Sequence, residues 1–259
     1  MQRETGMREI TDRDISLTFA KGMSVLKAFD TGATHLTLPQ IARITGLDRA
    51  SARRLVLTLV HLGYVKQDER VFSLTPRILV LASGFLQAHQ FGKTIEPVLR
   101  AFSQQISDAI SMAMIDGFEA VYVAHAGADS RPASIGFTVG SRVPLLPSAI
   151  GRALVAACPP EQSRELIHNA PLERFTDSTV MDREAIAADI ALTAKRGFAF
   201  VEGEFEAGVA AIATPVRSES GEAASLGISG SAPRLADESY RNRVIDILRE
   251  CSKAVAALL

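Results

Sequence analysis

The sequence predicts an α+β protein of two domains, the first mainly helical and the second a sheet flanked by helices. Three observations support this prediction. The chain has 259 residues, which is long for one compact domain and suits two. Residues 17–62 contain helical segments with clear start and stop signals. Beyond residue 91, strand-like and helical segments occur in blocks, a pattern typical of α+β folds.

The charge is distributed unevenly between the two parts. Residues 1–89 carry 12 Lys and Arg against 8 Asp and Glu, a formal +4, whereas residues 90–259 carry 16 against 21, a formal −5. This asymmetry favours a polyanionic partner for the first part only. No apolar run approaches the roughly 20 residues that span a bilayer, so no membrane partner is expected. Two distant cysteines and no CxxC pair suggest a reducing cytoplasm and no metal site.

Residues 1–16 are predicted to form a polar tail, followed by a helix at about Leu17–Asp30. Its apolar stripe consists of Phe19, Met23, Leu26 and Phe29. A second, short helix at about Leu38–Thr45 begins with a capping box formed by Thr37 and Gln40. The sequence "TGLD" then makes a tight turn. Two helices joined by three or four residues that include a glycine have the helix-turn-helix layout.

The third helix follows in "DRASARRLVLTLVHLGYV", where Asp48 is the expected cap. Its apolar stripe, which should face the core, consists of Ala52, Leu55, Leu59 and Leu62. Its arginines crowd into the N-terminal half, the half that a recognition helix inserts into the major groove. A solvated basic face is the alternative explanation, but the order of cap, turn, packing stripe and following hairpin favours DNA binding.

The segment "YVKQDERVFSLT" alternates and contains a polar turn, so it predicts a two-stranded wing that can touch the DNA backbone. The first domain is therefore a winged helix-turn-helix over residues 17–75, and residues 76–90 form a linker helix that begins at Pro76. Double-stranded operator DNA is the expected partner. The predicted DNA-contacting residues are Thr37, Gln40, Arg49, Ala50, Ser51, Arg53, Arg54, Thr58, Lys66 and Arg70.

Three runs in this order, "AKGMSVLKAFD", "LTLPQIARITGLDRASARRLVLTLVHLGYV" and "FSLTPRILVLASGFL", resemble the IclR family of bacterial transcription regulators. The resemblance continues through "RVPLLPSAIGRALVA", "TAKRGFAF", "GVAAIATPVR" and "ASLGISG", so it covers nearly the whole chain. It is strongest to the branch that regulates aromatic-acid and β-ketoadipate-pathway catabolism. It implies that residues 91–259 form an effector-binding domain similar to GAF and PAS sensors, and that the chain forms homodimers or homotetramers.

The second domain is expected to contain strands at about 109–116, 120–127, 133–140, 198–203, 209–216 and 223–230. Its helices are expected at about Ile95–Ser107, Ser148–Ala157, Glu161–Asn169, Arg183–Arg196 and Asp237–Leu258.

The stretch "LLPSAIGRALVA" is the best candidate for a ligand site. Ser148 can cap a helix whose first N–H groups belong to Ala149, Ile150 and Gly151, and free N–H groups at a helix start bind carboxylates without a cation. An ordinary capped helix explains the same residues. The resemblance favours the site, because the matching segment of the family holds a carboxylate ligand.

Other pocket positions come from the resemblance or from strand alternation. Ser229 matches a family serine that bonds the ligand, and Glu202 lies where some members have a pocket acid. Ala211 and Gly227 replace Cys and Ser of some members, which implies a less polar pocket. Two residues on one strand face could line an apolar wall, although plain core packing is the favoured explanation of each: Met112 and Met114.

An enzyme acting on a small organic acid, with an appended DNA-binding domain, is the alternative function. The five histidines are scattered, and no HExxH, GxSxG, P-loop or GxGxxG motif occurs, so no catalytic residue or cofactor is predicted. Glu202, Glu204 and Glu206 have strand periodicity and could share one face, where a solvated strand end is the simpler explanation than a cation site. The sequence thus favours a regulator that senses a small aromatic or dicarboxylic acid.

Overall fold

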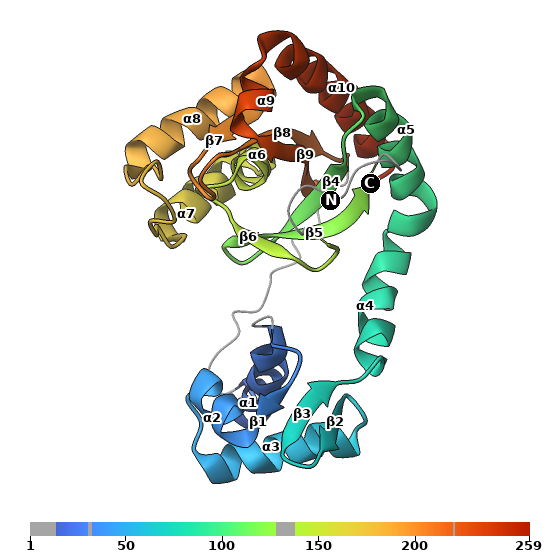
Figure 1. Cartoon of the computed structure of the whole chain (residues 1–259), viewed down its shortest axis with the longest axis vertical. Helices are drawn as coiled ribbons and strands as arrows, with labels where there is room; N and C mark the ends of the chain where they lie inside the picture. The colour runs from blue at the N-terminus through green and yellow to red at the C-terminus, as the bar shows by residue number, and fades with distance from the viewer. Residues whose placement is uncertain (1–13, 31–32, 128–137, 220) are drawn as a thin grey trace, which may run out of the picture. The chain divides into compact units, whose positions relative to one another are not determined.

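The computed structural model describes residues 14–30, 33–127, 138–219 and 221–259 (Figure 1). The chain divides into two compact units, Met1–Phe85 and Leu86–Leu259. The boundary lies within a single helix, α4 (Arg77–Ala88). Within the described ranges, no helix combines the length and the apolar character needed to cross a membrane.

The first unit is built on helices with side-chain caps. The Thr37 N–H donates to Gln40 Oε1 at 2.8 Å, and Asp48 Oδ1 accepts from the Ser51 N–H at 2.9 Å. Between these two starts, Gly46 adopts φ 67°, a left-handed conformation that glycine reaches without steric cost. The helices are α1 (Leu17–Lys27), continued by a 3₁₀ turn at Ala28–Asp30, α2 (Leu38–Thr45) and α3 (Arg49–His61).

The wing is present and has one strand more than predicted. The strands β2 (Val65–Asp68) and β3 (Val71–Leu74) form the expected antiparallel hairpin. A two-residue strand, β1 (Leu36–Thr37), pairs with the other edge of β3. A pairing this short leaves no alternation in the sequence, so only the fold reveals it.

The apolar stripe predicted for α3 is partly wrong. Ala52 and Val56 are fully buried, whereas Leu62 is 46% exposed and lies at the C-cap, beyond the last helical residue. Leu55 and Leu59 pack against the core from its margin. In α1, Phe19 is 70% exposed, and Val25 supplies the buried contact. Residues four apart share one helix face, and the face that meets the neighbouring helices is centred between Ala52 and Val56.

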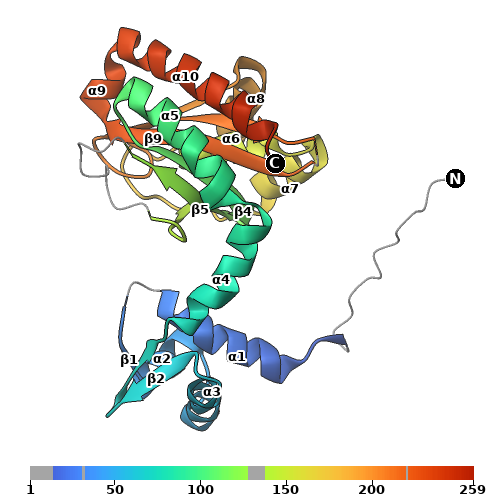
Figure 2. The ribbon, with the colours of Figure 1, turned by 90° about the vertical axis from the view of Figure 1, so that its right-hand side faces the viewer.

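The second unit is an antiparallel six-stranded sheet in the order β6-β5-β4-β9-β8-β7, with helices on both faces. Figure 2 shows α5 and α10 together on one face, where they cover a core that includes Leu99, Ile110 and Leu248. Helices α6 and α8 pack on the other face, over Leu145, Leu154 and Ile190. The strands are β4 (Ile110–Asp116), β5 (Glu119–Ala126), β6 (Arg142–Pro144), β7 (Ala199–Glu202), β8 (Val209–Arg217) and β9 (Ala223–Ser231). The helices are α5 (Glu96–Ile106), preceded by a π turn at Phe91–Ile95, α6 (Ala149–Ala157), α7 (Pro160–Asn169), α8 (Arg183–Arg196), α9 (Ala232–Ala236) and α10 (Glu238–Ala256).

The α+β class and the order of these elements confirm the predicted fold. The strand predicted at 133–140 falls largely outside the described residues. Two short elements, β6 and α9, were not predicted, because three and five residues carry too little periodicity to be recognised.

Strand β5 contains one irregularity that matters for the site. Met112 pairs with Ala124 and Ala113 pairs with Tyr122, so Val123 is an extra residue, a β-bulge. Because opposed residues face the same side, the bulge lets Tyr122 and His125 share one face of the sheet. In a regular strand these two side chains would point to opposite faces.

Candidate functional site

One candidate site is the exposed face of α3. Arg49, Arg53 and Arg54 are exposed, and none of them has an ion-pair partner within the part of the chain that the structure describes. Ala50 is exposed beside them, and Ser51 is half-buried. The three guanidinium groups are therefore free to meet an anion, and no bulky side chain between Arg49 and Arg53 holds the helix backbone away from it.

The other predicted DNA-contacting residues are also at the surface, but several are already hydrogen-bonded. The Thr58 hydroxyl donates to the Arg54 carbonyl at 2.9 Å, and Thr37 and Gln40 are engaged in the cap of α2. Lys66 and Arg70 are exposed, on and just after β2 in the wing. The Ser51 N–H lowers the pKa of Asp48, so the cap of α3 stays charged at neutral pH.

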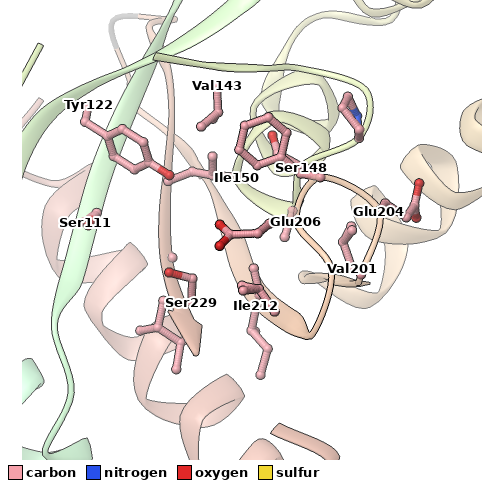
Figure 3. Close-up of a pocket in the computed structure, with 18 residues that line it drawn as sticks. Ser111, Tyr122, Val143, Ser148, Ile150, Val201, Glu204, Glu206, Ile212 and Ser229 are labelled. Atoms are coloured by element: carbon pink, nitrogen blue, oxygen red, sulfur yellow. The ribbon is translucent and has the colours of Figure 1, made fainter. Parts of the chain in front are cut away.

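The second candidate site is a pocket in the second unit, between the sheet and the start of α6 (Figure 3). The space that no atom fills amounts to about 630 Å³, and this figure includes open solvent at the mouth of the pocket. Most of its wall is apolar. The polar and charged lining side chains are Ser111, Tyr122, Ser148, Glu204, Glu206 and Ser229.

The α6 end of the pocket offers backbone donors. Ser148 Oγ donates to the Pro144 carbonyl at 2.6 Å and accepts from the Gly151 N–H at 3.2 Å. The N–H groups of Ala149 and Ile150 also belong to the first turn, where the helix itself supplies no acceptor. Both residues line the pocket. This arrangement can bind an anion through backbone N–H groups and the helix dipole.

Gly151 lies behind this surface and does not line the pocket. A Cβ at this position would stand 2.3 Å from the Leu145 carbonyl oxygen, so the close approach of α6 to the preceding segment requires glycine. The contribution of Gly151 is this packing together with its N–H bond to Ser148.

A buried arginine of α6 holds in place the part of the pocket wall that contains Glu204. Arg152, only 4% exposed, pairs with Glu204 at 2.7 Å and with Asp189 at 3.1 Å. Its Nε donates to the Leu146 carbonyl at 2.8 Å, and Glu204 also accepts from the Val180 N–H at 3.2 Å. These contacts hold the Glu204 side of the pocket against α6. Sequence reasoning missed Arg152, although a single charge inside the apolar run "SAIGRALVAA" was a usable signal.

The sheet side of the pocket carries Ser111 and Tyr122, placed together by the bulge in β5. Burial raises the pKa of Tyr122, so its phenol stays neutral. Ser111 Oγ lies 2.9 Å from His125 Nδ1. Burial lowers the pKa of His125, and the nearby Glu96 carboxylate opposes this shift only in part. Neutral donors and acceptors thus line this wall.

The structure brings Ser148, Ala149, Ile150 and Ser229 together at the pocket, but four predicted residues do not line it: Gly151, Met112, Met114 and Glu202. Met112 is fully buried in the core beneath α5 and α10, and Met114 packs against the same core. Strand alternation explains this, because Ser111 faces the pocket and its neighbour must face the other way. In β7 the lining residue is Val201, one place before the exposed Glu202.

The expectation that Glu202, Glu204 and Glu206 share one strand face is wrong. Strand β7 ends at Glu202, and the following residues turn back toward β8. Glu202 is exposed, Glu204 is buried against Arg152, and Glu206 lines the pocket. Among the described residues, no group of three His, Cys, Asp or Glu side chains could hold a metal ion.

Two small residues line the pocket at positions where some members of the family are expected to have Cys or Ser. Ala211 and Gly227 both line it. A Cβ on Gly227 would lie 2.9 Å from the Ile212 carbonyl oxygen, so a serine there would require the neighbouring strand to move.

Comparisons with known proteins cover both units of the chain. The family described as IclR helix-turn-helix domain matches residues 18–69, and that described as bacterial transcriptional regulator IclR C-terminal matches residues 84–257. The Pca regulon regulatory protein of Pseudomonas putida is 32% identical over 93% of this chain and 84% of its own length. The p-hydroxybenzoate hydroxylase transcriptional activator of Acinetobacter baylyi is 28% identical over 97% of this chain and 94% of its own.

A solved structure shares the fold. The IclR homologue of Microbacterium hydrocarbonoxydans, crystallised with 4-hydroxybenzoate, superposes with a TM-score of 0.77. The two sequences are 24% identical, and the alignment covers 92% of this chain and 97% of that one.

Proposed function

This chain belongs to the IclR family of bacterial transcriptional regulators. We propose that its first unit binds operator DNA and its second unit binds a small organic acid. Residues 17–75 bind the DNA, residues 76–90 connect the units, and residues 91–259 bind the effector. The predicted N-terminal tail, residues 1–16, lies largely outside the described residues. Since the target is chromosomal DNA, the working compartment is the cytoplasm.

The DNA-binding role of particular residues rests on the exposed face of α3. The groups that contact base edges or phosphates are Arg49, Arg53 and Arg54, because they are exposed and unpaired within the described chain. Lys66 and Arg70 add phosphate contacts from the wing. Thr37, Gln40, Ala50, Ser51 and Thr58 contribute shape and short polar contacts.

Arg53→Ala tests this assignment. If Arg53 reads a base edge, specific binding should weaken by about 1–3 kcal/mol while binding to scrambled DNA changes little. If it contacts a phosphate, both affinities fall together and the salt slope decreases by about one. Gel-shift titrations at several salt concentrations separate these cases, and a folded variant that binds both DNAs as the wild type does would refute the placement.

The effector-binding role rests on one observation: a mostly apolar pocket opens at the first turn of α6. The effector carboxylate accepts from the N–H groups of Ala149 and Ile150 beside Ser148, and Ser229 donates a further hydrogen bond. Gly151 supports this site from behind. An aromatic body fits the apolar walls, and regulators similar to this chain include one named for p-hydroxybenzoate hydroxylase. Met112, Met114 and Glu202 influence the pocket only through its supporting strands.

Calorimetry on the full chain with 4-hydroxybenzoate and its amide tests the anion site. The acid should bind more tightly than the amide, because only the acid carries the charge that the helix start favours. Ser229→Ala should weaken acid binding by about 1.5–3 kcal/mol through loss of one charge-assisted hydrogen bond. Equal binding of acid and amide, together with no effect of Ser229→Ala, would reject the site and leave the DNA-binding role intact.

Effector binding without turnover completes the proposal. The matched relatives are transcriptional regulators, and prolonged incubation of the acid with the protein should return it unchanged. Exposed apolar side chains on α1 and α4, including Leu17, Phe19, Leu81 and Phe85, supply surface for a homodimer or homotetramer that reads two half-sites. Sedimentation measures the assembly, and product analysis tests for turnover.

A further inference from the structure

The charge of the pocket lining is not balanced. Its described lining contains two carboxylates, Glu204 and Glu206, and no Lys, Arg or His. Arg152 neutralises Glu204 at 2.7 Å. Glu206 has no hydrogen bond or ion pair through its side chain to any residue that the structure describes. The pocket wall therefore presents one uncompensated negative charge.

The position of this charge is shown in Figure 3. The Glu206 side chain reaches into the middle of the pocket, with its carboxylate directed toward the space between Tyr122 and Ser229. Glu206 itself is exposed, so it stands at the open side of the pocket. The backbone around it is held in place, because the Val209 N–H donates to the Glu206 carbonyl at 3.2 Å and the adjacent Glu204 is fixed by Arg152.

Two electrostatic features of the pocket act on a ligand. The first turn of α6 offers N–H donors and the positive end of a helix dipole, which attract an anion. A carboxylate can only accept hydrogen bonds, so Glu206 favours a donor and repels a second anion. The rest of the lining is mostly apolar and includes Val143, Val201 and Ile212.

We propose that Glu206 is a specificity-determining residue that selects an effector with one carboxylate and, remote from it, a hydroxyl group that donates to Glu206. Dicarboxylates are disfavoured by the same charge. This inference rests on the proposed function, because the single carboxylate of the effector occupies the α6 end. It removes the dicarboxylic acids from the effector classes that the sequence leaves open.

Three para-substituted acids isolate the effect of the distal group. These probes are 4-hydroxybenzoate, 4-methylbenzoate, which has a substituent of similar size and no donor, and terephthalate, which carries a second carboxylate. Each is titrated calorimetrically into the full chain. Wild-type protein should bind the hydroxy acid about tenfold or more tightly than the methyl acid, since a charge-assisted hydrogen bond is gained. Terephthalate should bind most weakly.

Glu206→Gln keeps the side-chain shape and removes the charge. The preference for the hydroxy acid over the methyl acid should fall to within about threefold, and terephthalate binding should tighten by about tenfold. Glu165→Gln is the matched control, because Glu165 is an exposed residue of α7 outside the pocket lining. This control should keep the wild-type order of the three acids.

The outcomes separate this inference from the proposed function. If wild-type protein binds the acids without preference for the hydroxyl group, or prefers terephthalate, the role of Glu206 is refuted while acid binding stands. Unchanged ratios in Glu206→Gln refute it equally. If no acid binds, the proposed effector class falls, and this inference falls with it. If Glu206→Gln fails to fold, the relative affinities of the three acids for wild-type protein still test the role of Glu206.

Discussion

Helices α3 and α6 begin alike and work in opposite environments. In each, a capping side chain accepts the N–H of the residue three places on: Asp48 from Ser51 at 2.9 Å, and Ser148 from Gly151 at 3.2 Å. The arginines of α3 are exposed, whereas every residue of α6 is buried and Arg152 is 4% exposed. The cap sets where a helix starts, but burial and partners decide what its arginines do.

Of the substitutions that test this comparison, Arg152→Ala should lower the stability of the protein most. It leaves Glu204 buried without its 2.7 Å partner, and breaking a buried ion pair on one side costs about 3–5 kcal/mol. Arg53→Ala, its exposed counterpart in α3, should change stability by less than about 0.5 kcal/mol. Urea denaturation of both variants measures the difference. The double variant Arg152→Met with Glu204→Gln should recover part of the loss, and a loss below about 1 kcal/mol for Arg152→Ala alone would contradict the structural role.

Gly151→Ala should give the next largest effect. The added Cβ would lie 2.3 Å from the Leu145 carbonyl oxygen, and the required backbone shift typically costs about 1–3 kcal/mol. Ser51 occupies the same position of α3, third in the helix, and Ser51→Ala should cost less, because Ser51 already has a Cβ and the change adds no atom. Thermal unfolding of the two variants checks this. A neutral Gly151→Ala would mean that α6 does not pack closely on Leu145.

Asp48→Asn should give the smallest effect, a small loss of stability at neutral pH that disappears in acid. The pKa of Asp48 is lowered in the folded state, so its contribution to stability is present above the unfolded value of about 3.8 and is lost as pH falls through the folded pKa. Hydrogen exchange of α3 peptides between pH 5 and pH 2.5 should show added opening in the wild type that Asp48→Asn lacks. Ser148→Ala, which removes a cap that does not titrate, should show no such acid-specific change. Identical pH profiles for wild type and Asp48→Asn would contradict the assignment.

Much of the first unit was predictable because its signals are local. The capping box, the glycine turn and the wing hairpin each lie within a few residues, and the structure contains all three. The apolar stripe of α3 was displaced toward Val56, because a stripe read from one helix does not reveal where its neighbours lie.

The pocket was less predictable because its parts are distant in sequence. The Ser148 cap is local and was recognised, whereas Arg152 meets Glu204 across 52 positions, and no periodicity reports such a contact. The roles of Glu202, Glu204 and Glu206 depend on strand β7 ending at Glu202, and a regular alternation conceals that end. Met112 was assigned to the pocket because the sequence predicted its strand but not which face of the strand meets the pocket and which meets the core under α5 and α10.

The bulge in β5 has a consequence for insertions and deletions. A strand buried on both faces normally tolerates neither, because one residue more or fewer reverses every side chain beyond it. Val123 is the exception in β5, since Met112 pairs with Ala124 and Ala113 with Tyr122 on either side of it. Deleting Val123 would restore regular alternation and leave Tyr122 and His125 facing the sides they face now. Deleting Ala120 or Val121 would shift the strand against its partner. Among relatives of this chain, a one-residue gap in this strand should therefore fall at the position of Val123.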